Sequence, residues 1–340
     1  MSVVDTAEKL ALEQAMRLPE RVQRVLGGRS VVVDGQTLAA DVQLQLRLKR
    51  LTRQAGAETK PMAQGRRVIA HDTRLVGGDQ PVGSVRDLVA GGRPARLYVP
   101  TGAPASGPLL VFLHGGGFMH GDLETHDPAC RFLAENAGVR VLAVDYRLGP
   151  EHRFPAAYDD ALAAYAWVVD HAPELGADPD RLGVGGDSAG GTLATGVAIA
   201  AARHGWPCRV QLLVYPATDA RRATRSADLF ADGFYLTSAY MELANRSYAA
   251  TDADLDDPRY SPAKADLPPG LAPALVFTAG FDPLRDEGEA YAQRLTEAGA
   301  KVELTRFPDQ IHGFFNVVGV GRSSRDANRR VAAALRSAMA

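Results

Sequence analysis

A tight turn between an apolar strand and a small-residue helix constrains this sequence more than any other feature. The turn, Gly-Asp-Ser-Ala-Gly-Gly at 186–191, follows a short apolar run at 181–185 and precedes an Ala-rich run at 192–200. The first run is typical of a strand end and the second of a helix. Glycines flank Ser188 because the turn is too tight for side chains. The pattern predicts a nucleophile elbow, with the Ser188 hydroxyl at the end of a sheet and a helix N-terminus behind it.

Strands and helices alternate over most of the remaining chain. The continuous apolar run at 109–113 is typical of a central strand that is buried on both faces. Further strands are expected at 84–88, 95–98, 139–144, 182–184, 210–214, 274–278 and 302–307, and helices at 155–171, 192–203, 286–298 and 324–339. This alternation predicts an α/β fold with a mostly parallel, doubly wound sheet of eight strands.

Two segments fall outside this alternation. Residues 1–55 are expected to form helices, because apolar residues recur at helical spacing over 1–27, and residues 42–51 favour helix over strand. A polar linker is expected at 54–66, with strands from about residue 66. The insertion 217–266 is too long for a simple connection, and we expect a helix near 238–249 within it. The N-terminal helices and this insertion would form a cap over the core, 66–216 and 267–340.

Charge and composition exclude several classes of partner. The 340 residues carry a net charge of −2, which is no electrostatic footprint for nucleic acid. No apolar run approaches the 18 residues of a membrane span, and the N-terminus lacks the pattern of a secretory signal, so we expect a cytoplasmic protein. An N-terminal amphipathic helix can lie on a membrane, but packing on its own domain is the commoner use. Cys130 and Cys208 are expected as buried free thiols, with a disulfide as the alternative.

A catalytic serine needs a base and an acid that orients the base. In elbows of this kind the chain order is serine, acid, histidine. Only His204 and His312 follow Ser188, and His204 lies at the far end of the helix that starts at the elbow. His312 is therefore the candidate base. The candidate acid is Asp282, at the tip of the strand 274–278, whereas Asp286 one helical turn later is the better candidate for a helix cap.

A glycine-rich loop follows the buried strand 109–113. Its sequence is His114-Gly115-Gly116-Gly117-Phe118, and three glycines let bare N–H groups approach a developing oxyanion. A phosphate cradle is the alternative, but neither GxGxxG nor a P-loop Lys-Ser/Thr is present.

The histidines His114, His120 and His126 recur every six residues. This spacing fits neither one helix face nor a zinc motif, so we expect no metal and no cofactor. His114 is instead expected to hold the glycine loop by hydrogen bonds.

Five motifs together resemble the hormone-sensitive-lipase family of α/β-hydrolase esterases, in the branch with a Gly-Asp-Ser-Ala-Gly elbow. They are the His-Gly-Gly-Gly-Phe loop at 114–118, Asp-Tyr-Arg-Leu-Gly-Pro-Glu-His at 145–152, the elbow at 186–191, Asp-Pro-Leu-Arg-Asp-Glu at 282–287 and Ile-His-Gly-Phe at 311–314. The sequence departs from the family at Gly149, which is often alanine, and at Arg153, which is usually proline.

The resemblance implies an α/β-hydrolase fold, with Ser188, Asp282 and His312 as catalytic triad. It also implies an oxyanion hole, a cap made of N-terminal helices and an insertion after the sixth strand, and dimers, which are common in the family. The oxyanion hole would be formed by the amides of Gly116, Gly117 and Ala189. Supporting roles are expected for His114, Gly115, Asp187 and Tyr146.

Some residues near these motifs keep two interpretations. Tyr146 and Glu151 can support either the glycine loop or the core, and for Glu151 we favour the core. In the predicted cap, six apolar or aromatic residues can line an acyl pocket or form the core of the cap: Phe230, Phe234, Tyr235, Leu236, Tyr240 and Met241.

The sequence therefore predicts a serine carboxylesterase for short- to medium-chain acyl esters, with a small-molecule ester as its partner. A hydrolase of amides, lactones or acetylated small molecules would use the same residues and remains the alternative. A ligand receptor on a hydrolase scaffold is the third hypothesis, but such proteins typically lose a member of the triad, and here none is missing.

Overall fold

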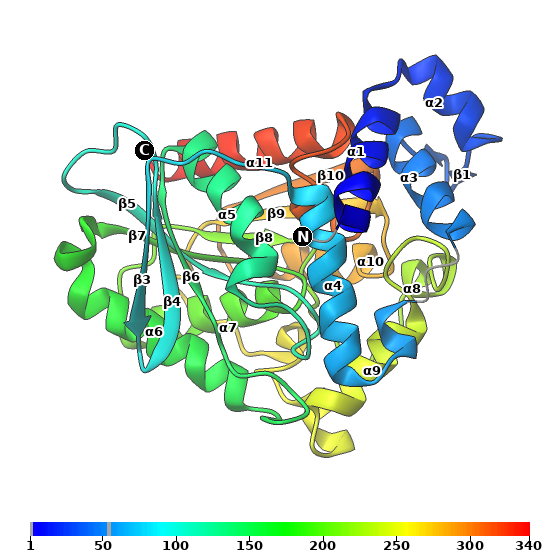
Figure 1. Cartoon of the computed structure of the whole chain (residues 1–340). Coiled ribbons are helices and arrows are strands. Elements are labelled where there is room, and N and C mark those ends of the chain that lie inside the picture. The colour runs from blue at the N-terminus through cyan, green and yellow to red at the C-terminus, as the bar shows by residue number, and fades with distance from the viewer. Residues whose placement is uncertain (1–2, 53–55) are drawn as a thin grey trace.

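An eight-stranded sheet forms the centre of the protein (Figure 1), in a computed structural model that describes residues 3–52 and 56–340. The strand order is β10-β9-β8-β7-β5-β6-β4-β3, and β4 alone runs antiparallel to its neighbours. The strands are β3 (Ser84–Ala90), β4 (Arg93–Val99), β5 (Gly107–Leu113), β6 (Arg140–Val144), β7 (Ala177–Asp187), β8 (Gln211–Val214), β9 (Ala274–Phe281) and β10 (Val302–Ile311). The predicted sheet of eight mostly parallel strands is confirmed.

Helices cover both faces of the sheet. On one side lie α6 (Ala156–His171), α7 (Ala189–His204) and α10 (Arg285–Glu297), and on the other α5 (Leu123–Ala137) and α11 (Ser323–Ala338). Successive side chains of β5 pack alternately into the two layers, so that Val111 contributes to the first and Phe112 to the second. This alternation explains why every residue of β5 is buried.

The N-terminal segment contains more helix than the sequence pattern indicates. It comprises α1 (Val3–Arg17), α2 (Glu20–Gly27), the hairpin β1 (Val32–Val33) and β2 (Gln36–Thr37), α3 (Ala40–Leu51), the short η1 (Ala57–Thr59) and α4 (Met62–Gly77). The expected helix over 1–27 is divided before α2, because proline at 19 disfavours a helical conformation of the residue before it. The helix expected at 42–51 is confirmed as α3.

The expectation of a linker at 54–66 and strands from residue 66 was wrong. Residues 54 and 55 lie outside the described part of the chain, but η1 and α4 occupy most of the remainder. Val68, Ile69, Leu75 and Val76 recur at helical spacing in α4, but the glycine and two arginines just before them and the polar residues between the two pairs obscure this period.

The insertion 217–266 contains α8 (Arg225–Leu229), α9 (Ser238–Tyr248), η3 (Asp252–Asp256) and η4 (Pro262–Lys264). The helix expected near 238–249 is therefore present as α9. The insertion and the N-terminal segment meet, since α9 contacts η1, and both lie at the same end of the molecule (Figure 1). The division into cap and core at the stated boundaries stays a prediction. Within the described residues, no helix combines the length and hydrophobicity needed to cross a membrane.

Glu287 of α10 connects the start of the insertion to the core. Its buried carboxyl group accepts hydrogen bonds from the backbone amides of Thr218 (2.7 Å) and Asp219 (3.2 Å), and its carbonyl accepts one from the Thr218 hydroxyl. Burial raises the pKa of Glu287 to about 7, although Arg222 and the two amides oppose the shift. The carboxyl group therefore gains a proton on folding at weakly acidic pH.

The elbow depends on a very close backbone approach. A Cβ atom at Gly190 would lie 1.9 Å from the carbonyl oxygen of Leu113, and one at Gly186 would lie 2.4 Å from the Gly190 backbone. Only glycine fits at these two positions, because backbone atoms on both sides cannot move away. The contact fixes the start of α7 against the end of β5.

We expect Gly190→Ala to destabilise the protein by more than about 3 kcal/mol, because the new methyl group would overlap the Leu113 carbonyl. Gly205→Ala is the matched control. Gly205 ends the same helix at φ +67°, and no atom of the described residues lies within 4 Å of its Cβ position, so the substitution should cost only about 1–2 kcal/mol. Urea unfolding followed by circular dichroism measures both, and equal shifts of the two midpoints would contradict the close approach.

The raised pKa of Glu287 predicts a pH-dependent stability. The unfolded carboxyl group ionises near pH 4.5 and the folded one near pH 7. Its contribution to the stability of the folded state is therefore complete below about pH 4.5 and is lost as the pH rises through 7. Relative to Glu287→Gln, the free energy of unfolding of the wild type should fall by up to about 3 kcal/mol between pH 4.5 and pH 7. Unfolding of both proteins across this range, with the exposed Glu297→Gln as control, tests it. A wild-type–variant difference that does not change with pH would rule the titration out.

Candidate active site

Ser188 lies at the junction of β7 and α7 in a strained backbone conformation. Its φ of +54° and ψ of −120° are unfavourable for a residue with a side chain, at a cost on the order of 1–3 kcal/mol. Its amide donates a hydrogen bond to the carbonyl of Val214 (2.9 Å), and its carbonyl accepts one from Ala217 (3.2 Å). These bonds to β8 and the chain beyond it hold the turn, so the hydroxyl is presented at the carboxyl edge of the sheet.

Ser188, His312 and Asp282 form a continuous chain of hydrogen bonds. The Nε2 atom of His312 lies 3.0 Å from the Ser188 hydroxyl, and its Nδ1 atom lies 2.8 Å from Oδ2 of Asp282. Asp282 follows β9 directly and His312 follows β10 directly, which brings both to the edge that carries the elbow. The structure thus brings together the three residues that the sequence singles out across 125 positions.

The environment of Asp282 determines which nitrogen of His312 carries a proton. The Asp282 carboxylate is fully buried, and its second oxygen accepts a hydrogen bond from the Leu284 amide (2.8 Å). A carboxylate accepts only, so Nδ1 of His312 must donate to it, and Nε2 is left to accept the serine proton. The ring of Tyr215 packs on His312 with centroids 4.4 Å apart. The imidazole is therefore held in the orientation that a general base needs.

The glycine loop adopts conformations that exclude side chains. Gly116 has φ +120°, and a Cβ atom there would lie 2.2 Å from the carbonyl oxygen of His120. At Gly117 (φ +62°) a Cβ atom would lie 2.9 Å from the Ala244 side chain of α9. Within the described chain, we find no acceptor for the amides of these two glycines. They are bare donors in the loop that follows β5.

Asp187 joins this loop to the elbow. Its Oδ1 atom accepts a hydrogen bond from the Gly115 amide (2.8 Å) and lies 3.2 Å from Nε2 of His126, while Oδ2 accepts from the Tyr215 hydroxyl (3.3 Å). Burial raises the pKa of Asp187, but His126 and the amide outweigh it and leave the pKa below its usual value. The charged carboxylate therefore fixes the glycine loop relative to Ser188. The sequence gives no sign of the His126 contact, because no pattern links residues 61 positions apart.

His114 and Tyr146 pack together under the same loop. Their rings stack with centroids 4.2 Å apart, and the Tyr146 hydroxyl donates to the carbonyl of His114 at 2.5 Å. The Nδ1 atom of His114 lies 2.8 Å from the Gly115 carbonyl. Burial, reinforced by His126, lowers the pKa of His114 to about 4, so its ring is neutral near pH 7. Both side chains thus contact backbone carbonyl groups at the start of the loop.

Two expectations for neighbouring residues need correction. Glu151 is exposed rather than part of the core, and it forms a bidentate ion pair with Arg66 of α4 (2.7 and 2.9 Å). Its position in a surface loop explains the difference, since a charged carboxylate keeps its contact with water there while it pairs with Arg66. Cys130 and Cys208 are both free thiols, as expected, although Cys208 is only partly buried.

The three regularly spaced histidines have separate partners. His126 contacts Asp187, His114 contacts the Gly115 carbonyl, and Nδ1 of His120 lies 2.8 Å from the Tyr240 hydroxyl. Among the residues that the structure describes, no group of three or more His, Cys, Asp or Glu side chains is placed to hold a metal ion.

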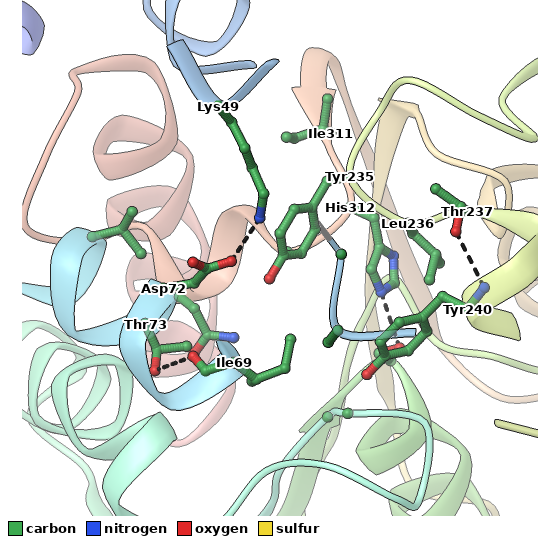
Figure 2. A pocket seen from close by; sticks show the side chains of 18 of the residues that line it. Lys49, Ile69, Asp72, Thr73, Tyr235, Leu236, Thr237, Tyr240, Ile311 and His312 are labelled. Carbon is green, nitrogen blue, oxygen red and sulfur yellow. Dashed lines mark hydrogen bonds and ion pairs between the residues drawn. The ribbon is translucent and has the colours of Figure 1, made fainter. Parts of the chain in front are cut away.

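A cavity of about 660 Å³ opens over Ser188 and His312. Its walls come from the glycine loop and elbow, from α1, α3, η1 and α4, and from the insertion. Of the six candidates in the predicted cap, Tyr235, Leu236 and Tyr240 line the cavity (Figure 2), and so does Met241. Phe230 and Phe234 instead pack against Phe281. The contribution of α4 was missed because its sequence did not suggest a helix.

We expect Asp187→Ala to lower kcat by roughly 100-fold with little change in KM, because the Gly115 amide loses its acceptor and the loop its anchor. Asp187→Asn keeps an oxygen for that amide and loses only the charge facing His126, so its loss should be smaller. Asp180→Ala, at the exposed far end of β7, is the control. Steady-state kinetics with one ester measures all three, and wild-type kcat in Asp187→Ala would contradict the assigned contact.

Comparison with known proteins identifies the family of the chain. Residues 110–316 match the family model for the alpha/beta hydrolase fold. The carboxylic ester hydrolase LipN of Mycobacterium tuberculosis is 44% identical over 94% of this chain and 88% of its own length. The ethyl acetate hydrolase of Pseudomonas putida is 40% identical over 83% of this chain and 93% of its own. A similar solved structure is that of the ester-hydrolase EH1AB1 from the metagenome of Lake Arreo, in complex with a derivative of bipyridine phosphonate. Its TM-score is 0.83 at 41% identity, and the match covers 88% of this chain and 98% of the other. The chain belongs to the alpha/beta hydrolase fold family, in the hormone-sensitive-lipase branch of esterases.

Proposed function

We propose that this carboxylic ester hydrolase cleaves short- to medium-chain acyl esters through an acyl-enzyme on Ser188. The observation that carries the proposal is the unbroken chain of hydrogen bonds from buried Asp282 through His312 to the Ser188 hydroxyl, at 2.8 and 3.0 Å. These distances lie within the range that proton transfer from a nucleophile to a general base requires. The hydroxyl lines the cavity, where an ester can reach it.

Each residue of the site has a role in the proposed reaction. Nε2 of His312 takes the hydroxyl proton as Ser188 attacks the ester carbonyl, and the protonated ring then gives that proton to the departing alcohol. Asp282 stabilises the imidazolium without accepting its proton. Water activated by His312 attacks the acyl-enzyme in a second step and releases the acid and free serine.

The negative charge of the tetrahedral intermediate needs preorganised donors. Within residues 3–52 and 56–340, the amides of Gly116 and Gly117 have no protein acceptor, and that of Ala189 is at the N-terminus of α7, where the first amides have no intrahelical partner. We assign these three amides to the oxyanion. Each such donor typically contributes about 3–4 kcal/mol to the transition state. Asp187, Gly115, His114 and Tyr146 hold the loop that carries two of them.

The size of the cavity and its apolar walls favour acyl chains of short to medium length. Apolar side chains from the insertion and from three N-terminal helices surround the route to Ser188, among them Leu236, Met241, Ile69 and Leu46. The relative from Pseudomonas putida is named for the hydrolysis of ethyl acetate, a short acyl ester. The cytoplasmic location and the homodimer expected from the sequence stay predictions.

We expect Ser188→Ala to lower kcat/KM for p-nitrophenyl butyrate by a factor of about 10⁴ or more, because the acyl-enzyme cannot form. Ser337→Ala, an exposed serine on α11, is the matched control and should retain full activity. Equal activity in Ser188→Ala and wild type would refute the proposal. Parallel measurements with butyramide and butyrolactone test the substrate class, and faster turnover of either than of the ester would replace the esterase assignment.

A further inference from the structure

An ion pair between a lysine and a carboxylate lies on the wall of the largely apolar cavity, away from the elbow. The ammonium group of Lys49 on α3 lies 2.6 Å from Oδ2 of Asp72 on α4, and both residues line the cavity. Figure 2 shows the pair across the cavity from His312, with the ring of Tyr235 between them. The pair is thus at a distance from the reacting atoms but on the surface that a bound ester meets.

Tyr235 brings the insertion into this cluster. The Lys49 ammonium lies 5.0 Å from the centroid of its ring, and Tyr235 adopts φ +79°, a strained conformation for a residue with a side chain. Its ring also lies against Gly313, next to His312, where a Cβ atom would be 3.1 Å away. Helix α3, helix α4 and the insertion therefore meet at the ion pair, and the insertion also contacts the residue next to His312.

The pair has hydrogen-bonding capacity to spare. An ammonium group has three donors, and the partner that we find for Lys49 in the described part of the chain is a single carboxylate oxygen. The other oxygen of Asp72 has no protein donor among the described residues. Both side chains are partly accessible, at 31% for Lys49 and 16% for Asp72. A group in the cavity can therefore accept from Lys49 and donate to Asp72.

The local charges indicate what kind of group fits. Burial lowers the pKa of Lys49, but Tyr235, Asp72 and Glu58 outweigh it and keep the ammonium charged. A carboxylate ligand would meet the negative charges of Asp72 and Glu58, and an ammonium ligand would meet Lys49. A neutral hydroxyl group has both a donor and an acceptor and meets no like charge.

We propose that Lys49 and Asp72, with Tyr235, form a polar subsite that selects esters whose far end carries a neutral hydroxyl group over purely alkyl esters of the same length. This inference rests on the proposed esterase function and names a substrate class within it. An alkyl chain at this position would remove water from the ion pair without replacing its hydrogen bonds, which costs binding energy. A hydroxyl group would replace them.

The test compares matched esters in wild type and in K49M/D72L. One series varies the acyl side, with p-nitrophenyl alkanoates of six to eight carbons and their terminal hydroxy counterparts. A second varies the alcohol side, with acetates of alkanols and of the corresponding alkanediols. For each pair of esters, kcat/KM of the hydroxy ester is divided by kcat/KM of the alkyl ester. In the series whose variable chain extends past Tyr235, this ratio should be roughly three- to tenfold lower in K49M/D72L than in wild type. An unchanged ratio in both series would overturn the proposal.

Two controls separate the subsite from general damage. R306M/E289L removes an ion pair of similar exposure between β10 and α10, outside the cavity, and should leave both ratios unchanged. Ethyl acetate is short on both its acyl and its alcohol side, so its kcat/KM should stay within about twofold in every correctly folded variant. If K49M/D72L fails this check, K49M alone carries the comparison.

Binding to inactive protein makes the result independent of catalysis. The Ser188→Ala protein, with and without K49M/D72L, is titrated calorimetrically with the same esters. The subsite is supported if the hydroxy esters bind with lower Kd than the alkyl esters and this preference is lost in the protein that lacks the ion pair. That result would support the subsite even if the wild type hydrolysed none of the esters, and the missing hydrolysis would then refute only the proposed function. Equal Kd ratios in the two proteins, alongside normal esterase activity, would refute only the subsite.

Discussion

The carbonyl oxygen of Leu113 lies so close to Gly190 that no side chain can fit between the end of β5 and the start of α7. This contact helps to set the position of Ser188, which lies two residues before Gly190 at positive φ. It also sets the position of the proposed oxyanion donors, since the glycine loop begins at the residue after Leu113. Ser188 and the proposed donors thus share one backbone anchor, and their separation is fixed by main-chain atoms rather than by flexible side chains. Such preorganisation lets the site stabilise developing charge without rearrangement.

Two buried carboxyl groups connect this part of the core to the glycine loop and to the insertion. Asp187 joins the elbow to the glycine loop through the Gly115 amide, and His126 keeps it charged. Glu287 joins the core to the base of the insertion, and there burial dominates and raises its pKa to about 7. The same side-chain chemistry serves both connections, but the neighbouring charge decides the protonation state. The loop contact thus persists near neutral pH, whereas the contact at the insertion loses stability as the pH rises.

Where one physical constraint acts alone, the sequence was sufficient to predict the structure. Continuous apolar runs indicated the buried strands, and the positions just after strand ends predicted where Asp282 and His312 would meet Ser188. Helix α4 was missed because its apolar residues are interrupted by arginines and glycine, and its helical state depends on packing against α5 and η1. Glu151 was expected in the core, but its partner Arg66 lies in that unrecognised helix, so nothing in the sequence indicated a surface ion pair. The subsite at Lys49 and Asp72 likewise joins helices whose relative placement only the tertiary fold defines.

The most direct test of the central claim is covalent labelling with a p-nitrophenyl phosphonate ester, which resembles the tetrahedral intermediate and forms a stable bond to an activated serine. Intact-mass measurement followed by peptide mapping locates the label. We expect one phosphonyl group per chain, on the peptide that contains Ser188, with no label in Ser188→Ala and much slower labelling in His312→Ala. A label on another residue, or labelling of Ser188→Ala at the wild-type rate, would contradict the assignment of Ser188 as the nucleophile.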